Sequence, residues 1–396
     1  MQKVSEKKTK KNSKFLNNKV DYILVITVLT LLTIGVVMVL SASAPSALSM
    51  TKSSYTYFFK QFGFAIAGLC IMYIVSKIDY RIYKKYYWVI YIISVLILLL
   101  VLVPHLGVEV KGARRWIKLP GIGQFQPSEI TKIGMILFYA GYLTDHKDDL
   151  KDFAKGFLLP LTFVLIPMGI LYVFQNHLSV CLVIGAITCV MMLIAGSRML
   201  HFVLVGLLGI AGVGGYLAKN LTSESDSFRI DRILVFLNPW SDATGTGYQM
   251  IQSLYAIGSG GLFGVGLGNS KQKYLYIPEP QNDFIFSILA EELGFVGCSV
   301  VIILFAIFVW RGIVIAINHK DDMFAMLMAT GITVMIAVQV IINIAVVTNS
   351  MPNTGIPLPF ISYGGTSMVI MMACMGILMN ISRYDEISES EIERKK

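Results

Sequence analysis

The sequence has few charged residues. Of its 396 residues, 14% are Asp, Glu, Lys or Arg and 55% are hydrophobic, whereas a soluble domain carries about 25% charged residues. So few charges cannot cover the surface of a soluble domain. Several runs are nearly free of charge and close to the roughly 20 residues that a helix needs to cross a bilayer. These runs are Tyr22–Leu40, Trp88–Val103, Phe157–Phe174, Val180–Ala195 and Phe202–Leu217.

Five further apolar stretches raise the expected number of transmembrane helices to about ten. The pattern predicts an all-α polytopic membrane protein with a single integral domain over residues 20–384. Residues 1–19 are expected to form a disordered basic cytoplasmic tail, and residues 385–396 a charged cytoplasmic tail. The further stretches are Phe58–Val75, Ile133–Leu143, Phe284–Trp310, Met323–Val347 and Ser367–Ile381.

Cysteine is also scarce, and all five cysteines lie inside apolar stretches. This placement favours packing residues over a disulfide framework or a metal site. No cleavable signal peptide is expected, because the first apolar run is too long for one. The net charge of +9 comes mostly from lysines of the N-terminal tail, so nucleic acid is not an expected partner. The tail is expected to lie against anionic membrane lipids.

The distribution of Lys and Arg predicts the orientation. With both termini in the cytoplasm, the inside segments carry about twice as many of these cations as the outside ones, as the positive-inside rule requires. The longest outside loop, between spans 7 and 8, covers about residues 218–281. Its first part, Ser227–Trp240, has helical periodicity, which fits either an amphipathic helix in the interface or a short helix packed on the spans.

The second outside loop, His105–Gln126, runs against the insertion bias. It carries four cations and one acid, Glu109, together with an aromatic residue suited to the membrane interface, Trp116. Two interpretations stay open. The cations are ordinary surface charges, or they form a pocket for an anionic headgroup, since guanidinium groups bind phosphate well. The cations are Lys111, Arg114, Arg115 and Lys118.

Two other outside segments have unusual backbones. Gly258–Gly268 is rich in glycine, but no βαβ unit can surround it in a helical membrane protein, so a dinucleotide-binding loop is excluded. Such a segment lets the backbone approach a bulky ligand or another helix. Pro352–Ser367, which includes Ser362, combines prolines with glycines. It cannot form a plain helix, and we expect it to be a re-entrant wall of a buried site.

Acidic residues flank or enter the apolar stretches. Asp283 precedes a span, where it is either a helix cap or, if Asn282 caps the helix, a general base at the aqueous rim. Glu291 and Glu292 lie deeper in that span. Glu129 and Lys132 form an i,i+3 pair in another. For these buried charges, a structural pair and a role in tuning the substrate are equally compatible with the sequence.

Several motifs in order along the chain resemble the shape, elongation, division and sporulation (SEDS) family, and the FtsW/SpoVE branch more than RodA. The resemblance covers about residues 20–384. The motifs are Gly112–Ile117, Gln126–Glu129, Gly264–Gly268, Pro278–Phe286, Glu291–Gly294 and Gly355–Gly365. One departure is Gln175–Ser179, where many relatives have Glu/Gln-Pro-Asp-Leu-Gly. There His177 is expected to be a satisfied interfacial histidine or to line the cavity.

The resemblance implies a multi-pass protein of the bacterial cytoplasmic membrane. It further implies a peptidoglycan glycosyltransferase that polymerises lipid II into β-1,4 glycan strands at the outer face, in division or sporulation, with a class B penicillin-binding protein as partner. Asp283 is the residue implicated in catalysis, and the Arg-Trp motif of the family maps to Arg115 and Trp116. A lipid II flippase and a non-catalytic scaffold for the penicillin-binding protein are the alternatives.

Lipid II is an α-linked pyrophosphate, so forming a β-1,4 bond inverts the anomeric carbon. A single base suffices, while the leaving pyrophosphate needs its charge stabilised. The hypothesis assigns Asp283 as the base. A divalent cation, Mg²⁺ or Mn²⁺, is left open as a cofactor, although the sequence has no dedicated ligand cluster. Substrate binding is assigned to Lys111, Arg114, Arg115, Trp116, Lys118, Glu129, Lys132, Glu291 and Ser362.

Overall fold

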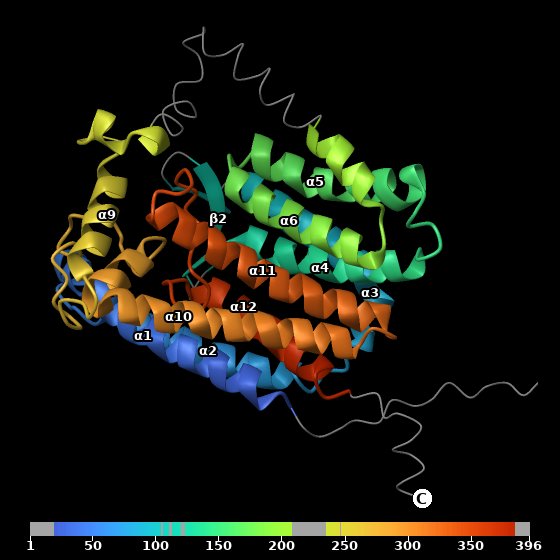
Figure 1. Ribbon diagram of the computed structural model, residues 1–396, viewed down its shortest axis with the longest axis horizontal. Coiled ribbons are helices and arrows are strands. Elements are labelled where there is room, and N and C mark those ends of the chain that lie inside the picture. Colours follow the sequence, from blue (N-terminus) through green and yellow to red (C-terminus); the bar gives the residue numbers. More distant parts are fainter. Residues whose placement is uncertain are drawn as a thin grey trace, which may run out of the picture.

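The computed structural model describes residues 20–103, 106–110, 113–119, 123–207, 235–245 and 247–384. Helices dominate this part of the chain, and most of them run side by side along the longest axis (Figure 1). They are α1 (Tyr22–Thr51), α2 (Thr56–Val75), α3 (Arg81–Leu99), α4 (Pro127–Asp145), α5 (Leu159–Val173), α6 (Leu178–Ala195), α9 (Tyr248–Gly260), α10 (Ile285–Asn318), α11 (Met323–Val347) and α12 (Gly365–Ile381).

The helices at the centre of the bundle are buried, and those around them present apolar side chains outward. In α4, every residue from Gly134 to Leu143 is buried, and α11 packs against α4, α6 and α10. The outer faces of α1, α2 and α10 expose Ile26, Phe59 and Ile303. Exposed apolar surface on so many helices fits contact with the hydrocarbon of a bilayer.

Among the described residues, seven helices are long and apolar enough to cross a membrane. The apolar α12 is shorter, with 17 residues, and α4 carries buried charges. The expected number of about ten spans stays a prediction, because the run Phe202–Leu217 continues beyond residue 207, the last described residue of that segment. The two tails and most of Ser227–Trp240 also lie outside the described residues.

The expectation of an all-α fold is too narrow, because the cationic loop forms a small antiparallel sheet. β1 (Gly107–Val110) pairs with β2 (Ala113–Leu119), which pairs with β3 (Gly123–Phe125). In β2 the apolar Ala113 and Ile117 are buried, while Arg114 and Lys118 are exposed. Local antiparallel pairing satisfies the backbone of a segment too short and too rich in cations to form a span.

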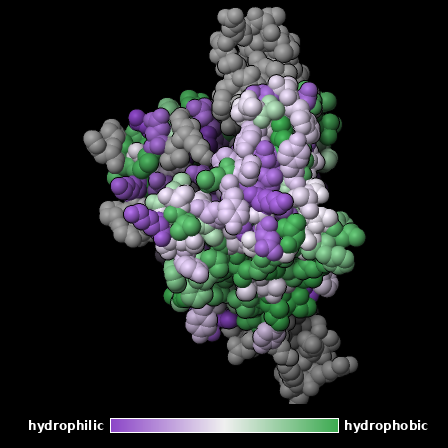
Figure 2. Space-filling model, turned by 90° about the vertical axis from the view of Figure 1, so that its left-hand side faces the viewer, coloured by the Kyte–Doolittle hydropathy of each residue, from purple (hydrophilic) through white to green (hydrophobic). Residues whose placement is uncertain are grey.

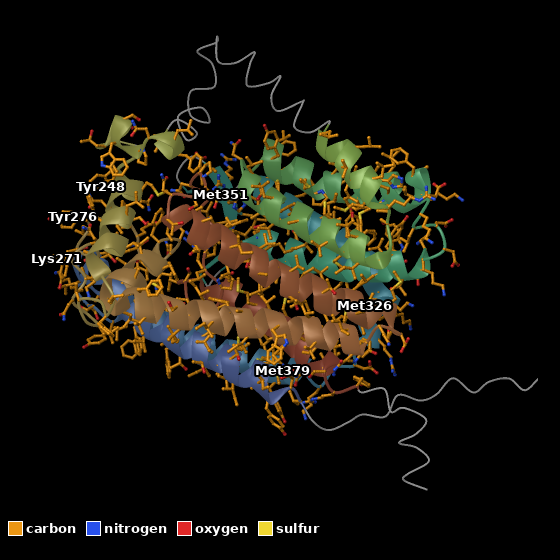
Figure 3. All side chains as sticks on the ribbon, viewed as in Figure 1. Tyr248, Lys271, Tyr276, Met326, Met351 and Met379 are labelled. Atoms are coloured by element: carbon orange, nitrogen blue, oxygen red, sulfur yellow. The ribbon has the colours of Figure 1, made fainter. Side chains whose placement is uncertain are left out.

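Both described chain ends lie at the same end of the bundle (Figure 1). The backbone N–H of Asp21 donates to the Ser382 hydroxyl (3.3 Å), and the Asp21 carboxylate pairs with Arg311 of α10 (2.6 Å). Met326 and Met379 lie at this end, whereas Lys271 and Tyr276 lie at the opposite one (Figure 3). A chain that crosses the membrane an even number of times has both of its ends on the same side, as observed here.

We call the opposite end, which carries β1–β3, α9 and residues 352–364, the site end. Seen end on, its hydrophilic residues gather over the upper and middle parts and its hydrophobic residues over the lower part (Figure 2). Residues 261–284 contribute exposed apolar side chains here, including Leu262, Phe263 and Leu275. A face that is partly polar and partly apolar is typical of the boundary between membrane and water.

The glycine-rich segment closes a break in α10. At Gly294 the helix backbone is non-helical (φ 66°, ψ −165°). The N–H of Val265 donates to the Glu291 carbonyl (2.9 Å), and the N–H of Phe295 donates to the Gly261 carbonyl (2.9 Å). A Cβ on Gly264 would meet the Glu292 carbonyl oxygen at 2.1 Å. Of the two expected partners, a ligand or another helix, the structure places a helix against this segment.

Glu291 and Glu292 hold the residues that follow this segment. Glu291 accepts from the Ser270 hydroxyl (2.5 Å) and from the Lys271 N–H (2.9 Å). Glu292, which is completely buried, pairs with the ammonium of Lys273 (2.9 Å) and accepts from the Ser41 hydroxyl of α1 (2.6 Å). These contacts favour the structural interpretation of both glutamates over substrate binding by Glu291.

We therefore expect Lys273→Met to lower the free energy of unfolding by about 3–5 kcal/mol, because Glu292 stays buried without its cation. Adding Glu292→Leu should recover part of that loss. The matched control is Lys271→Met, whose side chain is exposed and whose change should be small. Unfolding in detergent micelles measures all three, and a Lys273→Met protein as stable as the control would contradict the assignment.

Candidate functional site

Asp283 lies just before α10, at the site end. The helix begins at Ile285, and its N-cap residue is Phe284, which makes no side-chain cap hydrogen bond. The cap position is therefore occupied by neither of the two residues that the sequence allows, Asn282 and Asp283, and the Asn282 side chain donates to the Glu279 carboxylate (3.2 Å). The Asp283 side chain is half-buried. It therefore stands at the boundary between the packed bundle and the space outside it.

Asn343 of α11 joins the Asp283 segment to the proline-rich segment. Its side-chain Nδ2 donates to the carbonyl of Asp283 (2.8 Å) and to the carbonyl of Ile356 (2.8 Å). The side chain is 1% exposed, so water does not compete for these bonds. Two irregular segments, whose carbonyls have no helical partner, are thereby fixed to one rigid helix.

Residues 352–364 form the irregular, largely buried wall that the sequence predicts. Its middle packs into the bundle through Leu358, Phe360 and Ile361, each 2% exposed or less. Gly35 of α1 allows this approach, since a Cβ there would meet the Phe360 carbonyl oxygen at 2.2 Å. The Ser362 hydroxyl accepts from the Leu358 N–H (2.8 Å), a bond that shapes the wall.

The wall touches the Asp283 carboxylate at its exposed end. Gly355 has a left-handed backbone (φ 66°), and a Cβ at this position would lie 3.5 Å from the Asp283 Oδ2. The N–H of Tyr363 donates to the Gln281 carbonyl (2.8 Å), which ties the other end of the wall to the same segment. Glycine at position 355 adopts this left-handed backbone without strain and places no side chain beside the carboxylate.

The predicted i,i+3 pair in α4 is present. The Lys132 ammonium lies 2.8 Å from the Glu129 carboxylate, and both side chains are buried. Glu129 also accepts from the Ser367 hydroxyl at the start of α12 (3.0 Å). Because Ser367 follows residues 352–364 directly, the pair lies beside the same wall as Asp283. A role for Glu129 and Lys132 in substrate binding stays a prediction.

The cations of the sheet have different surroundings. The Arg115 guanidinium donates to the carbonyls of Gln175 (2.9 Å) and Asn176 (2.7 Å) in the loop before α6. Arg114 forms an exposed pair with Glu109 (3.4 Å). Lys118 is exposed and Trp116 is half-buried. The contacts of Arg115 favour a positioning role, and phosphate binding by Arg114 and Lys118 stays a prediction. Lys111 lies outside the described residues.

The first turn of α6 reaches the wall as well. The Ser179 hydroxyl donates to the carbonyl of Thr354 (2.6 Å), next to Gly355. His177, the residue at the start of α6, is 6% exposed. Burial, together with the nearby Arg115 and Lys132 cations, lowers the pKa of His177 from 6.5 to about 3. The imidazole is therefore neutral at physiological pH.

Buried polar atoms without a hydrogen-bond partner gather in these segments. Native proteins leave few such atoms unpaired, so a cluster of them points to water or a ligand. His177 Nδ1 is one of them, which contradicts the expectation of a satisfied interfacial histidine. Within the described residues of the site segments, these atoms are Ser128 Oγ, Gln175 Oε1, His177 Nδ1, Gln281 Oε1, Asn343 Oδ1 and Thr354 Oγ1.

Sequence reasoning missed Asn343, Gln61 and Ser179. Gln61 donates to the Ser362 carbonyl (3.2 Å) and so supports the wall from α2. For two of them the sequence does contain a signal. Gln61 and Asn343 are amides inside apolar stretches, where polar residues are costly and indicate a polar partner.

No group of three or more His, Cys, Asp or Glu side chains in the described part of the chain could hold a metal ion.

Fold and site together define a multi-pass membrane protein with a half-buried carboxylate on an irregular segment at one end and a buried Glu–Lys pair that contacts the start of α12. The family model for FtsW, RodA and SpoVE, described as "Cell cycle protein", matches residues 22–387. The chain belongs to this family. It is a multi-pass protein of the inner, cytoplasmic membrane.

Named relatives cover nearly the whole chain. Stage V sporulation protein E of Bacillus subtilis (strain 168) is 43% identical, over 92% of this chain and 97% of the relative. A probable peptidoglycan glycosyltransferase FtsW of Trichlorobacter lovleyi is 39% identical, over 91% of this chain and 93% of the relative. Both similarities agree with the resemblance that the motifs of the sequence carry.

Two solved structures share the fold. One is described as "Structural coordination of polymerization and crosslinking by a peptidoglycan synthase complex" (TM-score 0.76, 29% identity, covering 93% of this chain and 99% of the other). The second is the rod shape determining protein RodA of Thermus thermophilus (TM-score 0.67, 26% identity, covering 93% of this chain and 98% of RodA).

Replacing Asn343 by Leu should loosen both segments that it joins. Two buried carbonyls would lose their donor, at a cost of about 1–3 kcal/mol each. We expect faster amide hydrogen exchange in residues 281–284 and 352–364. The matched control is Gln339→Leu, which removes another buried amide one turn earlier on α11. Unchanged exchange in both segments would show that Asn343 does not hold them.

The depressed pKa of His177 makes stability depend on pH. Protonation favours the unfolded state, where the pKa is near 6.5, so His177 destabilises the folded protein as the pH falls from 6.5 toward about 3. His177→Asn removes this term. Relative to the variant, the wild type should lose up to about 1.4 kcal/mol per pH unit below 6.5. Parallel pH profiles of thermal unfolding for the two proteins would rule out the buried neutral imidazole.

Proposed function

We propose that this protein is an inverting peptidoglycan glycosyltransferase that polymerises lipid II at the outer face of the cytoplasmic membrane, in division or spore cortex synthesis. The carrying observation is the Asp283 carboxylate, held half-buried between the start of α10 and Gly355 of the wall. The printed names of the relatives, among them peptidoglycan glycosyltransferase FtsW, support the substrate class.

The reaction needs a base for the 4-hydroxyl of the acceptor sugar. Displacing an α-linked pyrophosphate from the opposite side gives the β-1,4 bond in one step, without a covalent intermediate. Asp283 takes the proton from the attacking oxygen. The Asn343 bond to the Asp283 carbonyl (2.8 Å) fixes the backbone from which the carboxylate projects, and a fixed base removes part of the entropic cost of reaching the transition state.

The leaving pyrophosphate needs cations. Lys132, Arg114 and Lys118, with Lys111, are the proposed partners of the phosphates, while Arg115 holds the loop before α6. Trp116 contacts the lipid-linked substrate at the interface. A divalent cation stays possible only as one carried by the phosphates, since the described residues offer no ligand cluster. No step of the mechanism depends on it.

A class B penicillin-binding protein is the proposed partner. The support is the fold shared with a chain of a peptidoglycan synthase complex, at 29% identity. Such a partner would cross-link the strands that this chain polymerises. A flippase or a scaffold would not need a carboxylate held beside Gly355. This arrangement favours the glycosyltransferase over both alternatives.

The test is polymerisation of purified lipid II in detergent by the protein with its partner. Asp283→Asn should reduce the rate by at least about 100-fold, because general base catalysis contributes roughly 10²–10⁴-fold. The matched control, Glu279→Gln, lies four residues earlier on the same segment and should keep most of the activity. The amount of glycan polymer formed over time is measured by gel electrophoresis.

Each alternative gives a different result in this assay. A flippase yields no polymer from either wild type or variant in detergent. A scaffold supports the partner equally well with Asp283→Asn. If the Asp283→Asn variant polymerised lipid II at the wild-type rate, the assignment of Asp283 as the base would be refuted. The assignment of lipid II as the substrate would still stand.

A further inference from the structure

His177 stands out because its surroundings match neither a packing residue nor an ion pair. The side chain is 6% exposed, and its Nδ1 has no hydrogen-bond partner. An unpaired buried polar atom costs about 1–3 kcal/mol. An apolar side chain would fill this position without the cost of burying an unpaired nitrogen. The partner of Nδ1 is therefore to be sought in a molecule that binds to the protein.

The position of His177 places it beside the proposed site. Ser179, two residues on, donates to the Thr354 carbonyl (2.6 Å). Gly355 follows Thr354, and a Cβ on it would lie 3.5 Å from the Asp283 carboxylate. The Arg115 and Lys132 cations lie close enough for their charges to act on the imidazole. His177 thus precedes a residue that contacts the wall, and the wall in turn contacts the Asp283 carboxylate.

The two cations have partners of their own. Arg115 donates to the carbonyls of Gln175 and Asn176, and Lys132 pairs with Glu129 at 2.8 Å. The imidazole beside them is a neutral polar group whose Nδ1 has no partner. A neutral imidazole carries one donor and one acceptor nitrogen.

We propose that His177 binds a hydroxyl group of the sugar of the lipid-linked substrate through Nδ1. A hydroxyl both donates and accepts, so it can bond to Nδ1 in either tautomer of the ring. A phosphate only accepts, so it could bond to Nδ1 in only one of the two tautomers of the ring. This proposal rests on the proposed function, and it makes His177 a residue that recognises the sugar rather than the pyrophosphate.

The experiment separates sugar recognition from catalysis by measuring binding. Two probes are used with the full-length protein: lipid II, and undecaprenyl pyrophosphate, which lacks the sugar. To prevent turnover, all proteins carry Asp283→Asn. Adding His177→Leu should weaken lipid II binding about fivefold, as expected for one neutral hydrogen bond, and leave binding of undecaprenyl pyrophosphate unchanged.

The amide variants locate the bond on the ring. His177→Asn puts an amide near the position of Nδ1 and should keep the preference for lipid II. His177→Gln reaches toward the position of Nε2 and should lose it. If His177→Leu fails to fold, the difference between the Asn and Gln variants still tests whether Nδ1 of His177 bonds to the sugar.

Two results would overturn the proposal. Equal weakening of both probes would mean that His177 only supports the structure, and unchanged binding of both would mean that water occupies the position. Failure of the proposed function gives a different result from failure of the His177 proposal. In that case the wild-type protein would not polymerise lipid II, whatever effect the substitutions of His177 have on binding.

Discussion

The two hydrogen bonds donated by the Asn343 amide connect the parts on which the site depends. An irregular segment within a helical membrane protein must find partners for its backbone groups inside the protein. Here one buried side chain bonds to the carbonyl of Asp283 and to that of Ile356. The Asp283 segment and the buried wall are thereby held to one helix, so the position of the proposed base follows from the packing of α11.

The same constraint explains the other unusual features of the site end. The break in α10 at Gly294 is closed by backbone groups of Gly261 and Val265. The buried carboxylate of Glu292 is matched by the Lys273 ammonium. Arg115 satisfies two carbonyls of the loop before α6. Motifs that look like ligand-binding loops in the sequence therefore divide into two groups. Most of them satisfy the backbone of the scaffold, whereas the segments around Asp283 also contain buried polar atoms without a partner, such as Gln281 Oε1 and Thr354 Oγ1.

The sequence predicted what depends on local pattern. Apolar runs indicate membrane helices, prolines and glycines indicate the irregular wall at 352–364, and the Glu129–Lys132 pair follows from helical spacing. The sequence could not reveal which distant groups meet. The partners of Asn343 and Arg115 lie on other segments, and the β2 strand looks like a charged loop because its pairing partners are short. The fate of Glu291, bonded to Ser270 and Lys271, depends on a fold that brings the glycine-rich segment against α10.

The central claim is that Asp283 acts on the acceptor sugar at the outer end of the bundle. The most direct measurement is a structure of the protein bound to a lipid II analogue that cannot be turned over. The account predicts the acceptor 4-hydroxyl within about 3.2 Å of the Asp283 carboxylate, with the pyrophosphate toward the cations of α4 and β2. A bound analogue whose 4-hydroxyl faces another acidic residue, or whose pyrophosphate rather than sugar lies beside Asp283, would contradict it.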